Sequence, residues 1–356
     1  PKVDGGSARR RLWRVVRVGA MCLALLVLLA GAGLTALYVK FDRNISHVDI
    51  DRALGRDRPE DSPNGSLDLL VLGSDSRAGT HGAYGQHKGA RADTAMIVHL
   101  NEARDAATVV SIPRDTLVDR PACERPGGGT EPARERVMFN ESYSVGGPAC
   151  AVKTVEELSG VRMDHYVEVD FKGFSQLVDT LGGVEVTTTQ AVRDEDSDLD
   201  LAAGTHTLDG EQALALVRTR KALADGSDLG RIRLQHSFVR ALARQVGGIG
   251  LLGDPRRLYE IADTTTRSVT TDSGLASASK LVGLARTLKG IDPDEMNMLT
   301  LPVALDPRDR NRVVPLDRQS REVWSALRED RPVPRNATEG SAAEPQSREG
   351  EIIAGE

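Results

Sequence analysis

The pattern of apolar and polar positions divides the chain at one uninterrupted apolar run. Residues 18–39 read VGAMCLALLVLLAGAGLTALYV and contain no charged side chain. A helix needs about 20 apolar residues to cross the hydrocarbon core of a bilayer, so this run is long enough to span it. No small-residue cleavage site with a polar stretch beyond it follows, and the run therefore predicts an uncleaved signal anchor.

Short apolar runs alternate with helical stretches in the rest of the chain. The runs are rich in leucine or β-branched residues and bounded by turn residues, which predicts buried strands. They lie at 67–73, 94–100, 107–112, 165–171, 183–188 and 297–303. Helix starts are predicted at Asp209, at Asp254 before Pro255, and at Ser273. Interleaved strands and helices predict an α/β fold, an α/β/α sandwich around a central mixed sheet, behind one N-terminal transmembrane helix.

The same pattern sets the expected domain boundaries. Residues 1–17 form a basic tail, residues 18–39 the transmembrane anchor, and the polar residues 40–66 a stalk. One domain is expected over 67–330, because no internal repeat is present and 356 residues suit one large or two ordinary domains. Residues 331–356 are poor in apolar side chains, which predicts a disordered tail.

Charge is distributed unevenly along the chain. Residues 1–17 carry a net charge of +5, whereas the whole chain carries −6. Positive residues favour the cytoplasmic side of a membrane span, so we expect a single-pass cell-membrane protein with a cytoplasmic N-terminus and an extracytoplasmic domain after the span. Aromatic residues make up only 3% and the bulk of the chain is acidic, which argues against nucleic acid as a partner.

The cysteines agree with this placement. Cys22 lies inside the apolar run, which leaves Cys123 and Cys150 as the only two thiols outside it. Disulfides persist in extracytoplasmic compartments, so the sequence predicts a Cys123–Cys150 disulfide. Two unpaired thiols are the alternative. A zinc site is disfavoured because no C-x-x-C or H-x-x-H spacing accompanies the cysteines.

Candidate chemistry lies where arginine and aspartate stand close together at predicted strand ends. The residues are Asp75 and Arg77, Arg91 and Asp93, Arg218 and Arg220, and the adjacent Arg114 and Asp115. In an extended chain, residues two apart point to one face. Arginine's planar fork matches phosphate oxygens, and Mg²⁺ binds carboxylate together with phosphate oxygens. The set predicts a diphosphate site with Asp75 and Asp93 as ligands of Mg²⁺ or Mn²⁺; ion pairs on a solvated surface are the alternative.

A helix predicted over residues 227–242 adds two polar residues. Leu234 and Phe238 belong to its apolar stripe, while Arg231 and Gln235, four residues apart, share a neighbouring face and are expected to meet the same ligand. No Walker loop, G-x-G-x-x-G or G-x-S-x-G motif occurs where a strand meets a helix, so the familiar nucleotide-binding and hydrolase classes are excluded.

Seven segments, in order, resemble the LytR-CpsA-Psr (LCP) family. They are GSDSR, RADTAMIVHL, SIPRDT, FNESYSVGG, DHYVEVDFKGF with LVDTLGGVEV, LDGEQALALVRTRK and SDLGRIRLQ, within residues 67–245. The sequence departs from the family's usual pattern at Met138, Leu234 and His236. The resemblance implies an LCP fold with a hydrophobic pocket for a polyprenyl chain. It also implies a phosphotransferase that moves a glycopolymer, such as teichoic acid or a polysaccharide, from a polyprenyl-pyrophosphate carrier onto peptidoglycan and releases polyprenyl phosphate.

The resemblance also implies roles for individual residues. Asp75, Asp93 and Arg114 are the catalytic candidates, with Asp75 and Asp93 as the magnesium pair. Pyrophosphate binding is implied for Arg91, Arg114, Arg218 and Arg220, with Arg77, Asp115, Asp228, Arg231 and Gln235 in support. Three alternatives stay open: a polyprenyl-pyrophosphate hydrolase, a membrane-anchored envelope or transcription regulator, and a non-catalytic polymer-binding protein.

Overall fold

The N-terminal part of the chain is one long helix. The computed structural model describes residues 5–62, 64–74, 92–195, 197–219, 228–248, 254–344 and 352–354. The chain forms two compact units, Pro1–Asn44 and Ile45–Glu356, and the first contains α1 (Gly5–Asn44). Side chains of residues 19–39 in α1 are exposed, Leu28 by 70%, and Gly19–Asn44 is long and apolar enough to cross a membrane. The predicted N-terminal apolar helix is confirmed.

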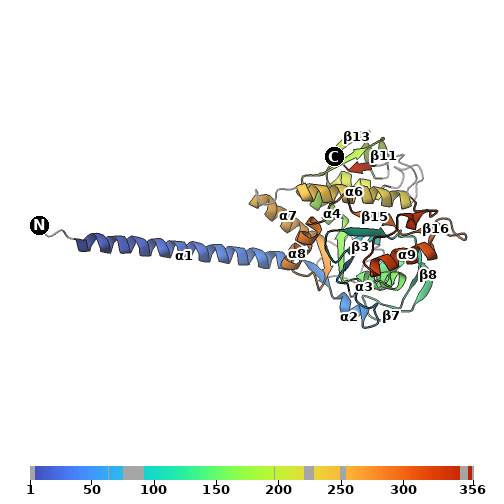
Figure 1. Cartoon of the computed structure of the whole chain (residues 1–356), viewed down its shortest axis with the longest axis horizontal. Coiled ribbons are helices and arrows are strands. Elements are labelled where there is room, and N and C mark those ends of the chain that lie inside the picture. The colour runs from blue at the N-terminus through green and yellow to red at the C-terminus, as the bar shows by residue number, and fades with distance from the viewer. Residues whose placement is uncertain are drawn as a thin grey trace. The chain divides into compact units, whose positions relative to one another are not determined.

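A mixed seven-stranded sheet forms the centre of the second unit (Figure 1). Its order is β1-β14-β9-β2-β3-β4-β15. Strand β2 pairs in parallel with β9 and antiparallel with β3, and β4 pairs antiparallel with β3. The carboxyl ends of β2, β4 and β9 and the amino end of β3 therefore meet at one edge. The strands are β1 (Ser46–Val48), β2 (Leu67–Ser74), β3 (Ala92–Leu100), β4 (Ala107–Ser111), β9 (His165–Asp170), β14 (Val269–Asp272) and β15 (Asn297–Thr300).

Helices cover both faces of this sheet, and Figure 1 shows α3 and α9 on one side of β3 and β15 and α4 and α6 on the other. Leu70 and Leu72 of β2 share a core with Trp324 of α9, whereas Leu69 packs in a separate core with Ile291. Alternate residues of a strand face opposite sides, so β2 is buried on both. The predicted α/β/α fold is confirmed. The helices are α2 (Ile50–Leu54), α3 (Phe139–Ser159), α4 (Phe171–Thr180), α5 (Gly210–Arg218), α6 (Asp228–Gly248), α7 (Pro255–Ser268), α8 (Ala278–Lys289) and α9 (Asp317–Arg328).

One predicted strand lies outside the central sheet. β10 (Val184–Thr188) pairs with β13 (Gly204–Leu208) and β18 (Ile352–Ala354) instead. Val184 and Phe238 of α6 meet in a further core. The remaining strands form short two-stranded ladders: β5 (Leu117–Arg120), β6 (Cys123–Glu124), β7 (Thr130–Glu131), β8 (Arg134–Met138), β11 (Val192–Asp194), β12 (Leu199–Leu201), β16 (Val303–Leu305) and β17 (Val313–Pro315).

Part of the segment expected to be a stalk, 40–66, belongs to the folded domain. Ile50 and Leu54 of α2 are 2% and 3% exposed and join the main core. Arg58 donates hydrogen bonds to Glu156 Oε1 at 2.6 Å and to the Met163 carbonyl at 2.7 Å. Two apolar residues four apart are enough to bury one face of a short helix, although the segment as a whole is polar.

The expected disordered tail, 331–356, is also ordered in part. Val333, Ala337 and Ala343 are buried in the main core, and a 3₁₀ turn covers Arg335–Thr338. The Ala342 amide donates to the Val303 carbonyl at 2.8 Å. A few apolar residues and backbone hydrogen bonds hold this segment in place. Its low overall apolar content therefore did not predict that it is ordered.

The local signals for helix starts and for the disulfide agree largely with the structure. Asp209 forms a complete capping box with Gln212, and Asp254 caps α7 ahead of Pro255. Helix α8 starts after Ser277 and not at the predicted Ser273, because Asp272 holds the intervening residues in a turn through the Leu275 amide. The predicted disulfide is confirmed: Cys123 of β6 is bonded to Cys150 of α3.

Candidate functional site

Asp93 projects from β3 at a β-bulge on the edge where the strand ends meet. Gly73 of β2 lies opposite Thr94, but Ser74 lies opposite Ala92, so Asp93 has no partner residue in β2. A bulge interrupts the regular alternation of side chains and redirects one of them, and such bulges are frequent next to active sites.

Arg114 lies in a tight turn after β4. The backbone amide and the hydroxyl of Thr116 both donate to the Pro113 carbonyl, at 3.0 and 2.6 Å. The Arg114 carbonyl accepts from the Asn140 amide, at the start of α3, at 3.1 Å. Arg114 Nη1 donates to Asp93 Oδ1 at 2.5 Å. The turn and the helix start thus fix the backbone from which Arg114 reaches the bulge.

Helix α6 brings three more polar side chains to the bulge. Asp228, Arg231 and Gln235 are spaced so that they share one helical face. Arg231 Nη2 lies 2.6 Å from Asp228 Oδ1 and donates to the Asp93 carbonyl at 2.9 Å. Gln235 Nε2 donates to Thr94 Oγ1 and to a carbonyl of α5, both at 3.0 Å. Arg231 and Gln235 therefore both reach residues 93–94 from one helical face, and that they meet the same ligand stays a prediction.

The charges of these groups are strongly coupled. Arg114 Nε lies 3.6 Å from both Asp115 Oδ2 and Asp228 Oδ1. Burial opposes the charge of Arg114, but the hydrogen bond to Asp93 and the surrounding carboxylates outweigh it and raise its pKa. Burial lowers the pKa of Arg231, against the attraction of Asp228, and burial raises the pKa of Asp228. We call Asp93, Arg114, Asp115, Asp228, Arg231 and Gln235 the arginine–aspartate cluster.

Several polar atoms of this cluster are buried without a hydrogen-bond partner among the described residues. They are Arg114 Nε, Arg231 Nε and both carboxylate oxygens of Asp228, whose approach to Arg231 lacks hydrogen-bond geometry. Buried polar atoms in folded proteins almost always have a partner. An oxyanion would satisfy the guanidinium N–H groups, and a hard cation would satisfy the carboxylate oxygens.

Arg218 occupies a different environment from the one its sequence predicted. It ends α5, so it is not an extended residue at a strand end, and its guanidinium carbon lies 4.7 Å from the centre of the Phe171 ring. It is next to the α5 residue Val217, whose carbonyl binds Gln235, and so stands beside the cluster. The remaining candidates, Asp75, Arg77, Arg91 and Arg220, lie outside the described residues.

The described part of the chain contains no group of three or more histidine, cysteine, aspartate or glutamate residues arranged to hold a metal ion. The proposed metal ligand Asp93 is bonded through Oδ1 to Arg114. Its predicted partner Asp75 is not among these residues. The donor set still fits a hard cation, because Asp228 offers two buried carboxylate oxygens without hydrogen bonds. Arg114 and Arg231, which bind Asp93, are also neighbours of Asp228.

Sequence reasoning missed a buried glutamate behind this edge. Glu168 of β9 accepts hydrogen bonds from Ser74 Oγ at 2.5 Å, from Tyr143 OH at 2.6 Å and from Tyr166 OH. Ser74 is the last residue of β2, so Glu168 fixes the point at which the chain departs toward Asp75. A charged residue inside the apolar run HYVEVD was the available signal.

A hydrogen bond between a buried serine and a partly buried histidine, also missed, joins β4 to α6. His236 Nε2 lies 2.7 Å from Ser111 Oγ. Burial, with a smaller contribution from Arg240, lowers the pKa of His236 to about 4, so the ring is neutral at pH 7. Arg114 follows Ser111 by three residues and Gln235 precedes His236, so the pair holds together the two elements that carry the cluster.

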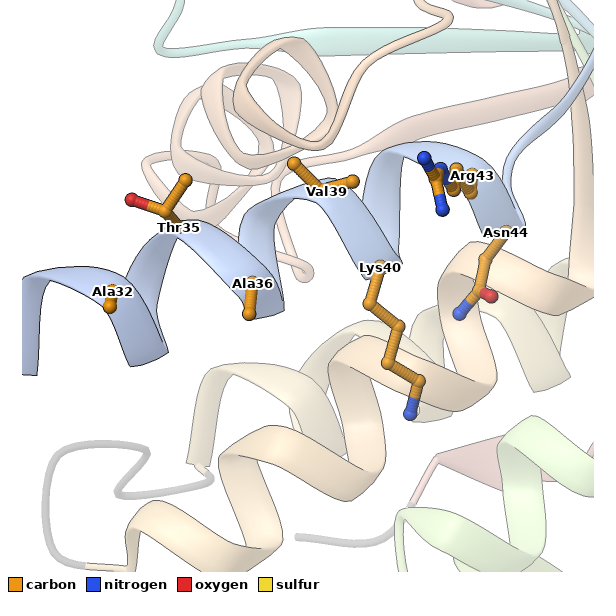
Figure 2. Close-up of a pocket in the computed structure, with 7 residues that line it drawn as sticks. All are labelled: Ala32, Thr35, Ala36, Val39, Lys40, Arg43 and Asn44. Carbon is orange, nitrogen blue, oxygen red and sulfur yellow. The ribbon is translucent and has the colours of Figure 1, made fainter. Parts of the chain in front are cut away.

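A surface hollow of about 770 Å³ lies along the last part of α1 (Figure 2). Its lining contains no member of the arginine–aspartate cluster. Figure 2 shows its seven lining residues, which all come from this helix: Ala32, Thr35, Ala36, Val39, Lys40, Arg43 and Asn44. The hollow belongs to the apolar helix and not to the candidate site.

Relatives with known names resemble this chain over most of its length. The cell wall biosynthesis protein LcpA of Corynebacterium glutamicum is 32% identical over 266 residues, 67% of this chain and 50% of LcpA. The probable cell wall biosynthesis protein LcpB of the same species is also 32% identical, over 77% of this chain and 64% of LcpB. The chain thus spans about half to two thirds of the length of these two proteins. The polyisoprenyl-teichoic acid–peptidoglycan teichoic acid transferase TagT of Bacillus subtilis is 32% identical over 80% of this chain and 85% of TagT.

Solved structures share the fold. A LytR-Csp2A-Psr enzyme from Actinomyces oris is 26% identical with a TM-score of 0.60, over 80% of this chain and 95% of that one. TagT bound to LIIa-WTA is 27% identical with a TM-score of 0.57, over 80% of this chain and 99% of that one. The model of the LytR_cpsA_psr family matches residues 37–329, which include the whole arginine–aspartate cluster. The chain belongs to the LytR_cpsA_psr family.

Proposed function

We propose that this protein is a membrane-anchored phosphotransferase that moves a cell-wall glycopolymer from a polyprenyl-pyrophosphate carrier onto peptidoglycan. The observation that carries the proposal is the pair of guanidinium groups of Arg114 and Arg231, whose buried Nε atoms lack hydrogen-bond partners among the described residues. Such N–H groups suit phosphate oxygens. The name of TagT, a teichoic acid transferase that acts between a polyisoprenyl carrier and peptidoglycan, supports the same reaction class.

The residues of the cluster have different roles in binding the substrate. Arg114 and Arg231 neutralise the pyrophosphate, and Asp93 and Asp228 hold the two guanidinium groups in place. Gln235 fixes α6 against β3 through Thr94. Arg218 supplies further positive charge beside the cluster. Arg91 and Arg220, which lie outside the described residues, are assigned to pyrophosphate binding by the family resemblance alone. Phosphoryl transfer depends mainly on such charge neutralisation and alignment, and it needs little covalent chemistry from the protein.

In the proposed reaction, a sugar hydroxyl of peptidoglycan attacks the phosphorus next to the glycopolymer. A new O–P bond forms, the P–O bond to the bridging oxygen breaks, and polyprenyl phosphate leaves with that oxygen. An aspartate of the cluster takes the hydroxyl proton. The product is a phosphodiester between the glycopolymer and peptidoglycan.

We further propose Mg²⁺, with Mn²⁺ as a substitute, as the cofactor. Asp93 and Asp75, with the carboxylate of Asp228 nearby, are the residues that would hold it, and it would supply positive charge to the phosphate oxygens. Asp93 serves either as ligand or as base in this scheme.

We also propose that α1 spans the membrane with the basic residues before it in the cytoplasm and the second unit outside. The arginines of residues 9–17 favour this orientation. The Cys123–Cys150 disulfide supports it, because disulfides persist in oxidising compartments.

The test is release of polyprenyl phosphate from a short-chain lipid-pyrophosphate-linked glycan by the full chain in lipid nanodiscs, with and without a peptidoglycan oligomer. We expect release that requires both acceptor and Mg²⁺ and that is lost in Arg114→Ala and Asp93→Ala. Arg318→Ala is the matched control, because Arg318 makes an exposed ion pair with Glu322 in α9.

Each other outcome identifies a different function. Release that does not need the acceptor indicates a pyrophosphate hydrolase. Lipid binding that weakens in Arg114→Ala, without any turnover by the native chain, indicates a polymer-binding protein. Turnover that is unchanged by EDTA contradicts the metal, and intact turnover in Asp93→Asn contradicts the role given to Asp93.

A further inference from the structure

Exposed apolar side chains of the second unit gather on consecutive helices. Among its described residues, six large apolar side chains are exposed, and five of them lie at the end of α6 or on α7 and α8. The sixth, Leu305, lies in β16. The five are Val246, Leu258 at 42%, Tyr259 at 36%, Val282 at 48% and Leu288 at 41%. Single exposed apolar residues are ordinary, but a concentration of them marks an interaction surface.

Helix α8 adds positive charge to this surface. It has no buried residue, three basic residues and no acidic one, although residues 40–356 together carry a net charge of −11. Val282, Arg286 and Lys289 fall at i, i+4 and i+7 and so share one face. A helix face that combines apolar with basic side chains is typical of a segment lying at the headgroup layer of a membrane.

Strand pairing keeps this surface close to the point where the chain leaves α1. Asn44 ends α1, and β1 follows it directly, with Ser46 opposite Thr270 of β14. Strand β14 is the connection between α7 and α8. At 1.5 Å per residue these two helices are only about 18–21 Å long. A membrane that contains α1 is therefore within reach of both.

We propose that this surface rests on the headgroup layer of a membrane that contains anionic lipid. The proposal depends on the membrane insertion of α1 proposed above. We call the surface the docking face, and it comprises Leu258, Tyr259, Val282, Arg286 and Lys289. Its apolar side chains enter the interface, and its basic side chains meet the lipid phosphates. Docking restricts rotation of the domain about its tether and faces the domain toward a lipid-linked substrate.

Fluorescence quenching by lipids tests the docking face in the full chain. The chain carries Cys22→Ser and Val282→Cys, is labelled at position 282 with an environment-sensitive fluorophore, and is placed in nanodiscs containing phosphatidylglycerol and lipids with a quencher just below the headgroup. We expect blue-shifted emission and quenching several-fold stronger than for the same label at Leu305→Cys. Leu305 is a matched control, because it is 44% exposed against 48% for Val282.

Charge reversal tests the electrostatic part. Arg286→Glu with Lys289→Glu leaves the cluster untouched and removes two positive charges from α8. Each basic residue near an anionic surface contributes about 1 kcal/mol, or roughly fivefold, so we expect the ratio of docked to undocked domain to fall at least 25-fold. Phosphatidylcholine nanodiscs should have a similar effect on the native chain. An unchanged ratio in both experiments would overturn attraction to anionic lipid.

A fluorophore at the native Cys22 distinguishes a failure of docking from a failure of α1 to insert into the membrane. Cys22 lies within α1, and a label there reports insertion of the span directly. Quenching at Cys22 but not at position 282 overturns docking and leaves the anchor standing. No quenching at Cys22 removes the anchor and docking with it. Blue-shifted emission at position 282 that the lipids do not quench means that protein covers the face, either α1 or a second copy, and this also overturns docking.

Discussion

The Arg114 guanidinium donates to the carboxylate of Asp93 across 2.5 Å and so joins the turn after β4 to the bulge in β3. The two side chains are 15% and 20% exposed, so the pair is shielded but reachable from solvent. With Nη1 committed to Asp93, the Nε edge of Arg114 faces Asp115 and Asp228. The geometry of this guanidinium, and not only its charge, therefore defines the site.

Arg114→Lys tests that statement. Lysine keeps the positive charge but has no planar fork, so it cannot serve Asp93 and the opposite carboxylates at once. We expect polyprenyl phosphate release to fall about 100-fold or more, as when a positioned charge-stabilising donor is lost. The measurement is the initial rate in nanodiscs, with Arg318→Lys as the exposed control. A rate within threefold of the native one would show that charge alone suffices.

Asp228→Asn should destabilise the domain through Arg231. Arg231 is only 4% exposed, and Asp228 is its ion-pair partner at 2.6 Å. Removing one member of a buried pair leaves an uncompensated charge, which costs about 3–5 kcal/mol of unfolding free energy. Urea denaturation measures it. Adding Arg231→Met also removes the unpaired positive charge, so the double variant should regain most of the lost unfolding free energy. A double variant no more stable than Asp228→Asn would contradict this account.

His99 should make stability depend on pH. Its Nδ1 lies 2.9 Å from Asp68 and its Nε2 lies 2.9 Å from Asp330, which joins β3 to the end of α9. Burial opposes protonation, but these two carboxylates outweigh it and raise the pKa of His99 above 6.5. The folded state therefore binds this proton more tightly than the unfolded state. The resulting stabilisation is complete below pH 6.5 and is lost as the pH rises through the raised pKa.

The measurement is the unfolding free energy in urea between about pH 6 and pH 9, where each unit of pKa difference contributes about 1.4 kcal/mol. His99→Gln should remove the decline with rising pH that His99 causes. His47→Gln is the control, because His47 is an exposed residue of β1, and it should retain the decline. Identical profiles for the native chain and His99→Gln would assign the pH dependence to other groups.

Gly146→Ala should destabilise the region of the disulfide. A Cβ at Gly146 would lie 2.7 Å from the Cβ of Cys150 and 2.8 Å from the Glu124 carbonyl oxygen, so the backbone must shift. Overpacking of this kind costs about 1–3 kcal/mol. Thermal denaturation under oxidising conditions measures the loss. Gly127→Ala, within the loop that the disulfide closes, meets nothing within 4 Å and should leave the melting temperature unchanged.

Local patterns in the sequence were sufficient for features that depend on neighbouring residues. The apolar run predicted α1, and leucine-rich or β-branched runs predicted β2, β3 and β4, because a strand buried on both faces is apolar throughout. The helix start at Asp209 depends on four consecutive residues and lies where it was predicted. The cysteine pair was predicted because only two thiols were available outside the span.

The arginine–aspartate cluster was predictable from the sequence in part, and the rest of it depends on tertiary structure. The sequence nominated its members, and the four-residue spacing of Arg231 and Gln235 predicted that they act together. Three features were not predictable from spacing. They are the bulge that leaves Asp93 without a partner in β2, the approach of Asp228 to Arg114, and the helical position of Arg218. These features depend on how β2, β3, β4 and α6 align, and residues far apart in the sequence set that alignment.

The sequence by itself therefore determined the N-terminal apolar helix, the strand segments, the disulfide and the residue types of the candidate site, because each follows from local periodicity, composition or counting. Tertiary structure decided that α2 and the residues Val333, Ala337 and Ala343 join the main core and that β10 lies outside the central sheet. It also decided that Glu168 accepts hydrogen bonds from three hydroxyl groups behind the site. The physical reason is that burial of a polar or weakly apolar segment is favourable only when distant residues supply its hydrogen bonds and packing partners.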